Sequence, residues 1–325
     1  MNREIKVCTV GGGTAMPIVN QGLINAGFIN IKSIVTTFDS GGDVGRIRTD
    51  ERGRVLAFSD YWRSLISLWK DGKQKQVWEE MLRYRDGRGR NFGNTFFQFL
   101  SEKEGNLGEV DELFEELTGA NLCGEVIPVS LAPSNVCFST ISGKQYKGEN
   151  FVDDLRMSSD VINNIWLDPV VEANDKVEEI LINADLIIVG PGTTYGSVLP
   201  NFLPNGFVEA YNKSKAKKIL LMNIVATGNE VNKATSNVYL DIFKKYLNTV
   251  APFDLVVMAD LEKLDKKLLK TITHFYGLEN SSIVKMDRFG GIKTIKVDIA
   301  KIEESNMRLR HSEEKLGEFF RTLEI

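Results

Sequence analysis

Short apolar runs alternate along the chain with glycine-rich or polar loops and with segments of helical periodicity. The run 5–10 is followed by a glycine loop and an amphipathic stretch over 16–25, and the same order recurs after each later run. Strand, loop and helix in repetition are typical of βαβ units, in which helices cover both faces of a parallel sheet. The predicted strands of this sheet are 5–10, 31–37, 184–189, 218–223 and 253–259, and the later predicted helices end near 213 or span 236–247 and 261–276.

Two segments depart from this pattern. Residues 60–118 are rich in Trp, Leu, Arg and Glu and have helical periodicity, which predicts a helical excursion over the sheet. Residues 126–130 and 136–142 have the pattern of short strands, which predicts a hairpin-like addition. No linker rich in Pro, Gly or Ser divides the chain and no internal repeat is visible. The pattern therefore predicts one α/β domain over residues 1–325, with a parallel sheet and a helical insertion.

Glycine-rich loops follow several predicted strands, at the sheet edge where open parallel sheets bind ligands. The first loop lies between the strand 5–10 and the helix 16–25. Its glycines let the backbone approach a phosphate closely, and N–H groups at the helix start favour an anion. The dinucleotide fingerprint G-x-G-x-x-G is absent, because Met16 stands at its last position. A tight turn without a ligand is the alternative. The candidate residues are Gly11, Gly12, Gly13 and Thr14.

The second loop covers residues 39–48, after the strand 31–37. A carboxylate here often holds a ribose hydroxyl in nucleotide-binding folds, and it would equally suit a divalent cation beside phosphates. The glycines make the loop mobile, and its two arginines are spaced to clamp an anion. A solvated flexible loop is the alternative. The residues concerned are Asp39, Gly41, Gly42, Arg46 and Arg48.

The third loop, residues 190–197, follows the most strand-like run of the chain and is the most specific of these signals. Successive N–H groups and several hydroxyls suit a phosphate or a sugar, and a loop without a ligand is the alternative. Two weaker segments are 91–95, which reads equally well as a capped helix start, and 223–230, which follows a strand. The candidate residues are Gly190, Gly192, Thr193, Thr194, Tyr195, Asn94 and Asn223.

Composition narrows the function classes. The chain has 325 residues and a net charge of 40 − 44 = −4, so it lacks the basic field that a general nucleic-acid binder needs. Two histidines exclude a multi-His metal centre. The three cysteines form no C-x-x-C pair and are expected to be buried or idle thiols. With no signal peptide and no apolar run long enough to span a membrane, we expect a cytoplasmic protein without a membrane partner.

Three of these runs together resemble the YvcK/CofD-like family. They are 11–14, 35–48 and 184–201, they occur in the family's order, and the resemblance covers nearly the whole chain. It implies a Rossmann-like three-layer αβα fold and a homodimer. It also implies one of two functions. One branch holds the Mg-dependent 2-phospho-lactate transferase, which moves a phospholactyl-type group from a guanosine diphosphate carrier to a deazaflavin hydroxyl. The other is the gluconeogenesis-factor branch, which binds UDP-sugars such as UDP-N-acetylglucosamine and is linked to carbon metabolism and cell shape.

The chain looks closer to the gluconeogenesis-factor branch, on the Gly-Pro-Gly-Thr-Thr-Tyr run and Asn223. By the same resemblance Arg310, and more loosely Tyr276, match residues of the nucleotide-sugar site. There a guanidinium and an aromatic ring would pair with and stack on the ligand. The chain departs from the family at Ala15, where the family has a glycine, and at 58–63, which replaces a Pro-Gly-Asp segment.

Two functions therefore compete. The first is a nucleotide or nucleotide-sugar binding protein with a regulatory role, whose phosphates lie on the first and third glycine loops. The second is a Mg-dependent transferase, in which Asp39 or Asp43 would ligate the metal and charge neutralisation would replace an obligatory base. An NAD-dependent dehydrogenase is a weaker third candidate, because the dinucleotide fingerprint is broken at Met16.

Overall fold

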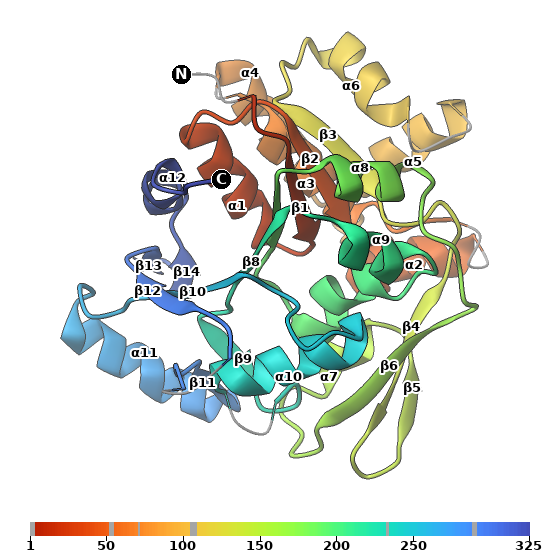
Figure 1. Ribbon diagram of the computed structural model, residues 1–325. Helices are drawn as coiled ribbons and strands as arrows, with labels where there is room; N and C mark the ends of the chain where they lie inside the picture. Colours follow the sequence, from red (N-terminus) through yellow and green to blue (C-terminus); the bar gives the residue numbers. More distant parts are fainter. Residues whose placement is uncertain (1–3, 52–54, 71, 105–108, 232–233, 288–290) are drawn as a thin grey trace.

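A seven-stranded parallel sheet forms the centre of the molecule, in the order β12-β10-β8-β7-β1-β2-β3 (Figure 1). The computed structural model describes residues 4–51, 55–70, 72–104, 109–231, 234–287 and 291–325. On one side of β1 the sheet continues with β2 and β3. The chain then crosses to the other side of β1, where β7, β8, β10 and β12 follow in that order. The strands are β1 Val7–Gly11, β2 Ile31–Val35, β3 Gly124–Pro128, β7 Leu186–Val189, β8 Lys217–Leu221, β10 Leu255–Ala259 and β12 Thr294–Val297.

Helices cover both faces of this sheet. In β7, Leu186 and Ile188 join the hydrophobic cluster of one face, and Ile187 and Val189 join that of the other, so every position of the strand is apolar and buried. The first cluster includes α1, α3, α5, α6 and α12, and the second includes α8, α9 and α10. The expected three-layer αβα architecture is confirmed. The helices on the first face are α1 Met16–Asn25, α3 Ser59–Leu68, α4 Lys73–Arg83, α5 Phe92–Glu104, α6 Val110–Thr118 and α12 Glu313–Arg321.

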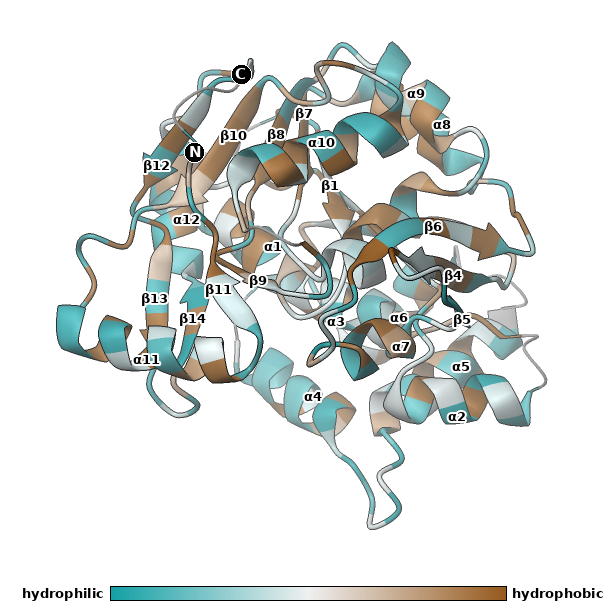
Figure 2. Ribbon diagram, turned by 90° about the horizontal axis from the view of Figure 1, so that it is seen from below, coloured by the Kyte–Doolittle hydropathy of each residue, from teal (hydrophilic) through white to brown (hydrophobic). Residues whose placement is uncertain are grey.

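The remaining elements lie around the edges and over the second face (Figure 2). Three small sheets pair β4 with β5 and β6, β9 with β11, and β13 with β14, all antiparallel. Their strands are β4 Asn135–Thr140, β5 Gln145–Lys147, β6 Ile162–Asp168, β9 Val225–Thr227, β11 Ser281–Ile283, β13 Ala300–Glu303 and β14 Arg308–His311. The other helices are α2 Gly42–Asp50, α7 Asn150–Asp154, α8 Lys176–Asn183, α9 Phe207–Lys213, α10 Ser236–Leu247 and α11 Lys266–Leu278.

Two of the predicted elements are wrong. The segment 126–130 does not pair with 136–142 in a hairpin: β3 extends the central sheet in parallel with β2, and β4 pairs with β5 and β6 instead. The segment 39–48 is not a mobile loop from end to end, because α2 begins at Gly42. Gly45 allows this helix to pack closely on the preceding turn, since an added Cβ would lie 2.1 Å from the carbonyl oxygen of Ser40.

Other expectations are confirmed in detail. The helices 16–25 and 236–247 occur as predicted, and α3 to α6 occupy the region of the expected helical excursion. The helix predicted from 261 starts at Lys266 instead, where the side chain of Asp265 caps it by accepting the N–H of Leu268 at 2.8 Å. The three cysteines are free and buried. Among the residues described, no helix has the length and apolar character needed to cross a membrane.

Candidate functional site

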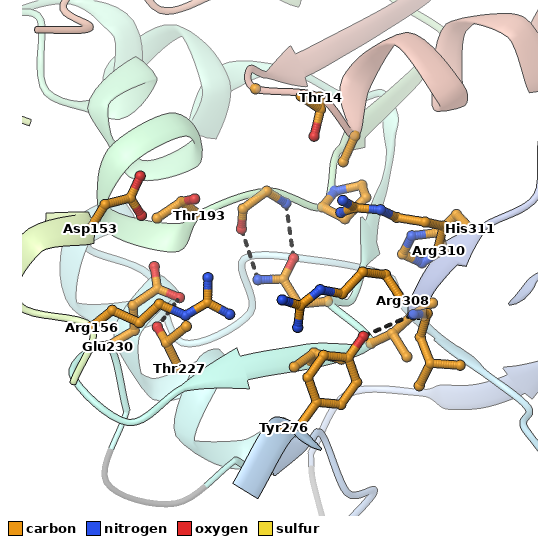
Figure 3. A pocket seen from close by; sticks show the side chains of 18 of the residues that line it. Thr14, Asp153, Arg156, Thr193, Thr227, Glu230, Tyr276, Arg308, Arg310 and His311 are labelled. Carbon is orange, nitrogen blue, oxygen red and sulfur yellow. Dashed lines mark hydrogen bonds between the residues drawn. The ribbon is translucent and has the colours of Figure 1, made fainter. Parts of the chain in front are cut away.

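A pocket lies where the strand order reverses. Because β1 sits between β2 and β7, the connections that follow β1 and β7 leave the sheet on opposite sides, and a crevice opens at the carboxyl ends of these two strands. A pocket of about 460 Å³ occupies this position. Small-molecule and cofactor sites span about 300–1,000 Å³, so it has room for one such ligand. The loops after β1, β7 and β8 line one side, and α7, β9, α11 and β14 line the other (Figure 3).

The loop after β1 contributes Gly13 and Thr14 to the pocket wall. Gly13 has a φ of +69°, a left-handed conformation that glycine adopts without strain. Its backbone N–H donates to Asp60, a carboxyl group at the start of α3 whose pKa is raised to about 6 by burial. A side chain at Gly12 would collide with that carboxyl group, because an added Cβ would lie 2.3 Å from Oδ2. Gly12 therefore serves the packing of the turn, and Gly13 and Thr14 line the pocket.

The loop after β7 contributes Gly192 and Thr193. Asn223, which follows β8, holds this loop with both ends of its amide. Its Oδ1 accepts the N–H of Gly192 at 2.9 Å, and its Nδ2 donates to the carbonyl oxygen of Gly192 at 2.8 Å. These are the two parallel dashed lines of Figure 3. Asn223 thus fixes the orientation of the Gly192 backbone where the loop meets the pocket.

An acidic side chain closes one end of the pocket. Glu230 is 4% exposed and accepts the backbone N–H of Tyr195 at 3.2 Å and the hydroxyl of Thr227 at 3.4 Å. Burial raises its pKa to about 7 despite these hydrogen bonds. Burial also raises the pKa of the neighbouring carboxyl group of Asp153, at the end of α7. Both groups can accept hydrogen bonds from ligand hydroxyls when ionised.

The opposite wall comes from β14 and α11. Arg308, Arg310 and His311 of β14 line the pocket beside Tyr276 of α11. The hydroxyl of Tyr276 accepts the N–H of Leu309 at 2.8 Å, and the guanidinium of Arg308 lies 5.5 Å from the centre of its ring. Burial lowers the pKa of His311 to about 4, so this histidine is neutral at physiological pH. Tyr276 therefore fixes the strand that presents the arginines, with Arg308 over its ring.

A third arginine reaches the pocket from the segment that follows α7. Arg156 lines the wall together with Arg308 and Arg310, although no motif in the sequence marked it. Its Nη2 donates to Glu279 at 3.5 Å and to Ser281 at 3.3 Å. Guanidinium groups from two separate segments therefore line the same pocket as the glycine loops. Arg308 could have been predicted from the sequence, since it stands two residues before the candidate Arg310 in the same strand. Nothing in the sequence around Arg156 resembles a ligand motif.

Comparison with known proteins places this site in a family. Residues 7–306 match the family described as 2-phospho-L-lactate transferase CofD. The chain belongs to that CofD family. The resemblance expected from the glycine loops is thereby confirmed over nearly the whole chain.

Relatives within the family carry a second name. Proteins of Listeria innocua and Listeria monocytogenes, each called gluconeogenesis factor, are 31% and 30% identical over 233 residues, which cover 69% of this chain and 69% of each relative. A Thermotoga maritima protein, to which the same name is given provisionally, is 28% identical over 323 residues, 97% of this chain and 98% of the relative. A solved structure from Bacillus halodurans aligns with a TM-score of 0.85 and 24% identity, over 98% of this chain and 99% of the other, and shows the same fold.

The pocket of this CofD-family chain brings together only part of the set of candidate residues. Residues of the first and third loops, of the β8 end and of the C-terminal segment meet there, whereas residues of the second loop do not line it. Their ligand roles stay predictions. The candidates that line the pocket are Gly13, Thr14, Gly192, Thr193, Asn223, Tyr276 and Arg310, and those that do not are Gly11, Gly12, Asp39, Gly41, Gly42, Asp43, Arg46, Asn94, Gly190, Thr194 and Tyr195.

Several of the second group have structural partners instead. The buried carboxylate of Asp43 accepts the N–H of Asn91 and the amide of Asn94, each at 3.0 Å. Arg46 donates to the carbonyl oxygens of Arg88 and Gly89, at 2.7 and 3.1 Å. Arg48 likewise donates to backbone carbonyl oxygens of the segment before α2. These contacts hold α2 in place beside the hairpin between α4 and α5.

The two carboxylates considered for Mg²⁺ do not share a site. Asp39 accepts the N–H of Gly41 at 2.7 Å and the hydroxyl of Ser59 at 2.5 Å, whereas Asp43 is buried against Asn91 and Asn94. Within the part of the chain that the structure describes, no group of three or more His, Cys, Asp or Glu side chains is arranged to hold a metal ion. Neither Asp39 nor Asp43 lines the pocket, and a role for either of them as a Mg²⁺ ligand stays a prediction.

Proposed function

We propose that this protein binds a nucleotide or a nucleotide-sugar of the UDP-sugar type in the pocket between β1 and β7, and that binding serves regulation of carbon or cell-wall metabolism. The observation that carries the proposal is the meeting of two glycine loops, at Gly13 and Gly192, on one side of a pocket whose other side presents arginines. The N–H groups of Gly13 and Gly192 are already bonded to Asp60 and Asn223, so a phosphate would meet the remaining N–H groups at the start of α1 and the guanidinium groups, both of which suit it. The gluconeogenesis-factor names of the Listeria relatives agree with a role in carbon metabolism.

The pocket combines two kinds of chemistry in a way that suits a nucleotide-sugar. The glycine loops and the arginines together supply groups for a diphosphate, whereas Glu230, Asp153 and Thr227 supply acceptors for hydroxyl groups. A sugar offers several hydroxyls to such acceptors, and a bare nucleoside triphosphate would place further negative charge beside them. The distribution of charge therefore favours a sugar-linked diphosphate over a triphosphate.

Thermal denaturation and calorimetry with UDP-N-acetylglucosamine, UDP-glucose, UDP, GDP and GTP test the proposal. A ligand that binds only the native state stabilises it by about 2.7 kcal/mol at a concentration of 100 Kd, so the transition should shift clearly upward. Asn223→Ala releases Gly192 and should weaken binding by at least about tenfold, since the loop is no longer preorganised. Asn212→Ala, which also removes an amide bond to a carbonyl oxygen but lies on α9, is the matched control. Wild-type protein that no nucleotide stabilises would refute the proposal.

A second candidate function is transfer of a phospholactyl-type group from a guanosine diphosphate-activated donor to a deazaflavin hydroxyl. The description of the family as 2-phospho-L-lactate transferase favours it. The acceptor oxygen would attack the distal phosphorus, the bond to the guanosine monophosphate leaving group would break, and the hydroxyl proton would pass to a carboxylate of the pocket such as Glu230. Mass spectrometry of the deazaflavin after incubation with activated phospholactate or phosphoenolpyruvate donors decides this case, and the absence of product with every donor counts against it.

Our proposal also includes a cytoplasmic homodimer that has neither nucleic acid nor a membrane as its partner. Light scattering coupled to size exclusion measures the mass in solution. A mass of about 73 kDa, twice the 36.4 kDa of one chain, supports the homodimer.

A further inference from the structure

The turn at the end of α11 connects three walls of the pocket. Asn280 donates from Nδ2 to the carbonyl oxygens of Arg156 and Ser158, both at 2.9 Å. Its own carbonyl oxygen accepts the N–H of Gly228 at 2.7 Å, next to the pocket residue Thr227. A side chain at Gly228 would collide with Asn280, because an added Cβ would lie 2.5 Å from Oδ1. This turn therefore ties the segment after α7 to the loop after β9.

Glu279, in the same turn, joins two arginines that are far apart in the sequence. Its carboxylate accepts both Nη atoms of Arg308, with the Nη2 to Oε1 distance 2.6 Å, in a bidentate pair. The same Oε2 accepts Nη2 of Arg156 at 3.5 Å, so one oxygen lies between the two guanidinium groups. Arg156 is 123 residues from Glu279 and Arg308 is 29 residues from it.

This arrangement leaves charge and donors for a ligand. Two guanidinium groups and one carboxylate carry a net charge of +1, and both arginines line the pocket. The Nε of Arg156 is buried and has no hydrogen-bond partner among the residues that the structure describes. The plane of Arg308 is held by the ring of Tyr276 as well as by the carboxylate. Without the carboxylate, like charge would drive the two guanidinium groups apart.

We infer that Glu279 is a positioning residue that holds Arg156 and Arg308 together as one anion-binding unit, and that this unit takes the distal phosphoryl group of a nucleoside diphosphate. The inference rests on the proposed function, because it assigns the phosphates of that ligand to opposite sides of the pocket. The proximal phosphoryl group lies on the glycine loops, and the distal one reaches the arginines. Such a site selects diphosphates over monophosphates, since a monophosphate cannot contact both sides.

Isothermal calorimetry with the pairs UDP and UMP, and GDP and GMP, tests this assignment. In the wild type the diphosphate of at least one pair should bind at least about tenfold more tightly than its monophosphate. In Glu279→Gln that ratio should fall about tenfold, with monophosphate affinity changed less than about twofold, because only the distal contact depends on the arginine pair. Glu279→Asp keeps the charge on a shorter side chain and should restore part of the ratio. Glu178→Gln on α8, which breaks an exposed pair with Lys213 of α9, is the matched control and should keep the wild-type ratio.

The outcomes separate this inference from the function on which it rests. If no nucleotide binds the wild type, the proposed function itself fails. If nucleotides bind but Glu279→Gln keeps the wild-type ratio, Glu279 does not position the arginines and the inference is overturned. If Glu279→Gln binds diphosphates more tightly, Glu279 competes with the ligand, which also overturns the inference. Equal losses for mono- and diphosphates, or for Glu178→Gln as well, would also overturn it, because they indicate a general loss of structure. A melting temperature recorded for each variant identifies any variant that does not fold. If Glu279→Gln does not fold, Arg308→Lys replaces it, because a single ammonium cannot form the bidentate pair. Its ratio of diphosphate to monophosphate affinity should then fall, and an unchanged ratio overturns the inference.

Discussion

The side chain of Met16 occupies the space beside Gly190, where a Cβ added to the glycine would lie 2.1 Å from the methionine Cε. It does the same at Gly11, where the distance would be 2.5 Å. In the dinucleotide fingerprint a glycine on the helix allows the helix to pack closely on the strands. Here the helix carries a methionine and the strand ends carry the glycines. The close contact of α1 with β1 and β7 is therefore kept, with the large and small residues exchanged.

Gly190→Ala should destabilise the protein by about 1–3 kcal/mol, because the added methyl group overpacks the contact with Met16. Combined with Met16→Ala, the substitution should cost less than it does alone, since the methionine no longer fills the space. Urea denaturation of the single and double variants measures this coupling, expected at about 0.5–3 kcal/mol. Simple addition of the two losses would show that Met16 does not cause the effect.

Asn94→Ala tests a ligand role against a structural one. The buried side chain of Asn94 accepts the indole N–H of Trp62 at 2.9 Å and donates to Asp43 at 3.0 Å. Alanine leaves the indole N–H of Trp62 unpaired and removes one of the two hydrogen bonds that the carboxylate of Asp43 accepts, so we expect a loss of about 1–3 kcal/mol in stability. Nucleotide affinity should stay at the wild-type level, because Asn94 does not line the pocket. Normal stability with weakened binding would instead support the ligand role predicted from the sequence.

The sequence revealed the parts of this structure that depend on local pattern. Continuous apolar runs such as Leu186–Val189 followed by glycine loops were enough to predict parallel strands and the edge where a ligand would bind. The placement of Gly13 and Gly192 on one pocket follows from that edge. Partners of edge strands depend on long-range pairing, which is why the segment containing β3 was assigned to a hairpin.

The rest of the site depends on residues that meet only in the folded chain. Arg156 and Glu279 belong to no sequence motif, and their contact spans 123 residues. By residue type Asp39 fits a ribose or cation site and Arg46 fits an anion site, yet their neighbours in space are Ser59 and a hairpin backbone. Residue type and spacing therefore identified groups able to bind an anion, and tertiary packing decided which of them reach the pocket.

Tyr276→Phe tests whether Tyr276 supports strand β14 through its hydroxyl or stacks on the ligand through its ring. The variant keeps the ring but loses the hydroxyl that accepts the buried N–H of Leu309, so stability should fall by about 1–3 kcal/mol. Nucleotide affinity should fall several-fold, because Leu309 lies between the two arginines that β14 presents. Tyr211→Phe, which loses a comparable buried bond to Pro252 away from the pocket, should lose stability and keep its affinity. Unchanged affinity in Tyr276→Phe would favour a ring that stacks on the ligand, as the family resemblance implied.

Glu149, at the start of α7, makes stability depend on pH in a direction opposite to that of most carboxyl groups. Burial, and next the charge of Asp39, raise the pKa of Glu149 from 4.5 to about 9, so the folded protein carries a neutral Glu149 at pH 7. Between these two values the folded state holds a proton that the unfolded state has released. The contribution of this group to stability therefore falls as pH rises from about 4.5 to about 9.

Glu149→Gln removes the titration and keeps the shape and a hydrogen-bonding amide. Relative to the wild type, the variant should gain stability steadily from pH 5 to pH 9. Over this range only the wild type loses stability, because its folded state retains a proton that its unfolded state releases. Denaturant unfolding at intervals of one pH unit measures the difference in stability. Glu178→Gln is the control for the general effect on stability of losing one negative charge. A difference between Glu149→Gln and the wild type that stays constant over this range would show that Glu149 is ionised in the folded protein, and that its carboxylate is balanced by a cation or by hydrogen bonds near Asp39.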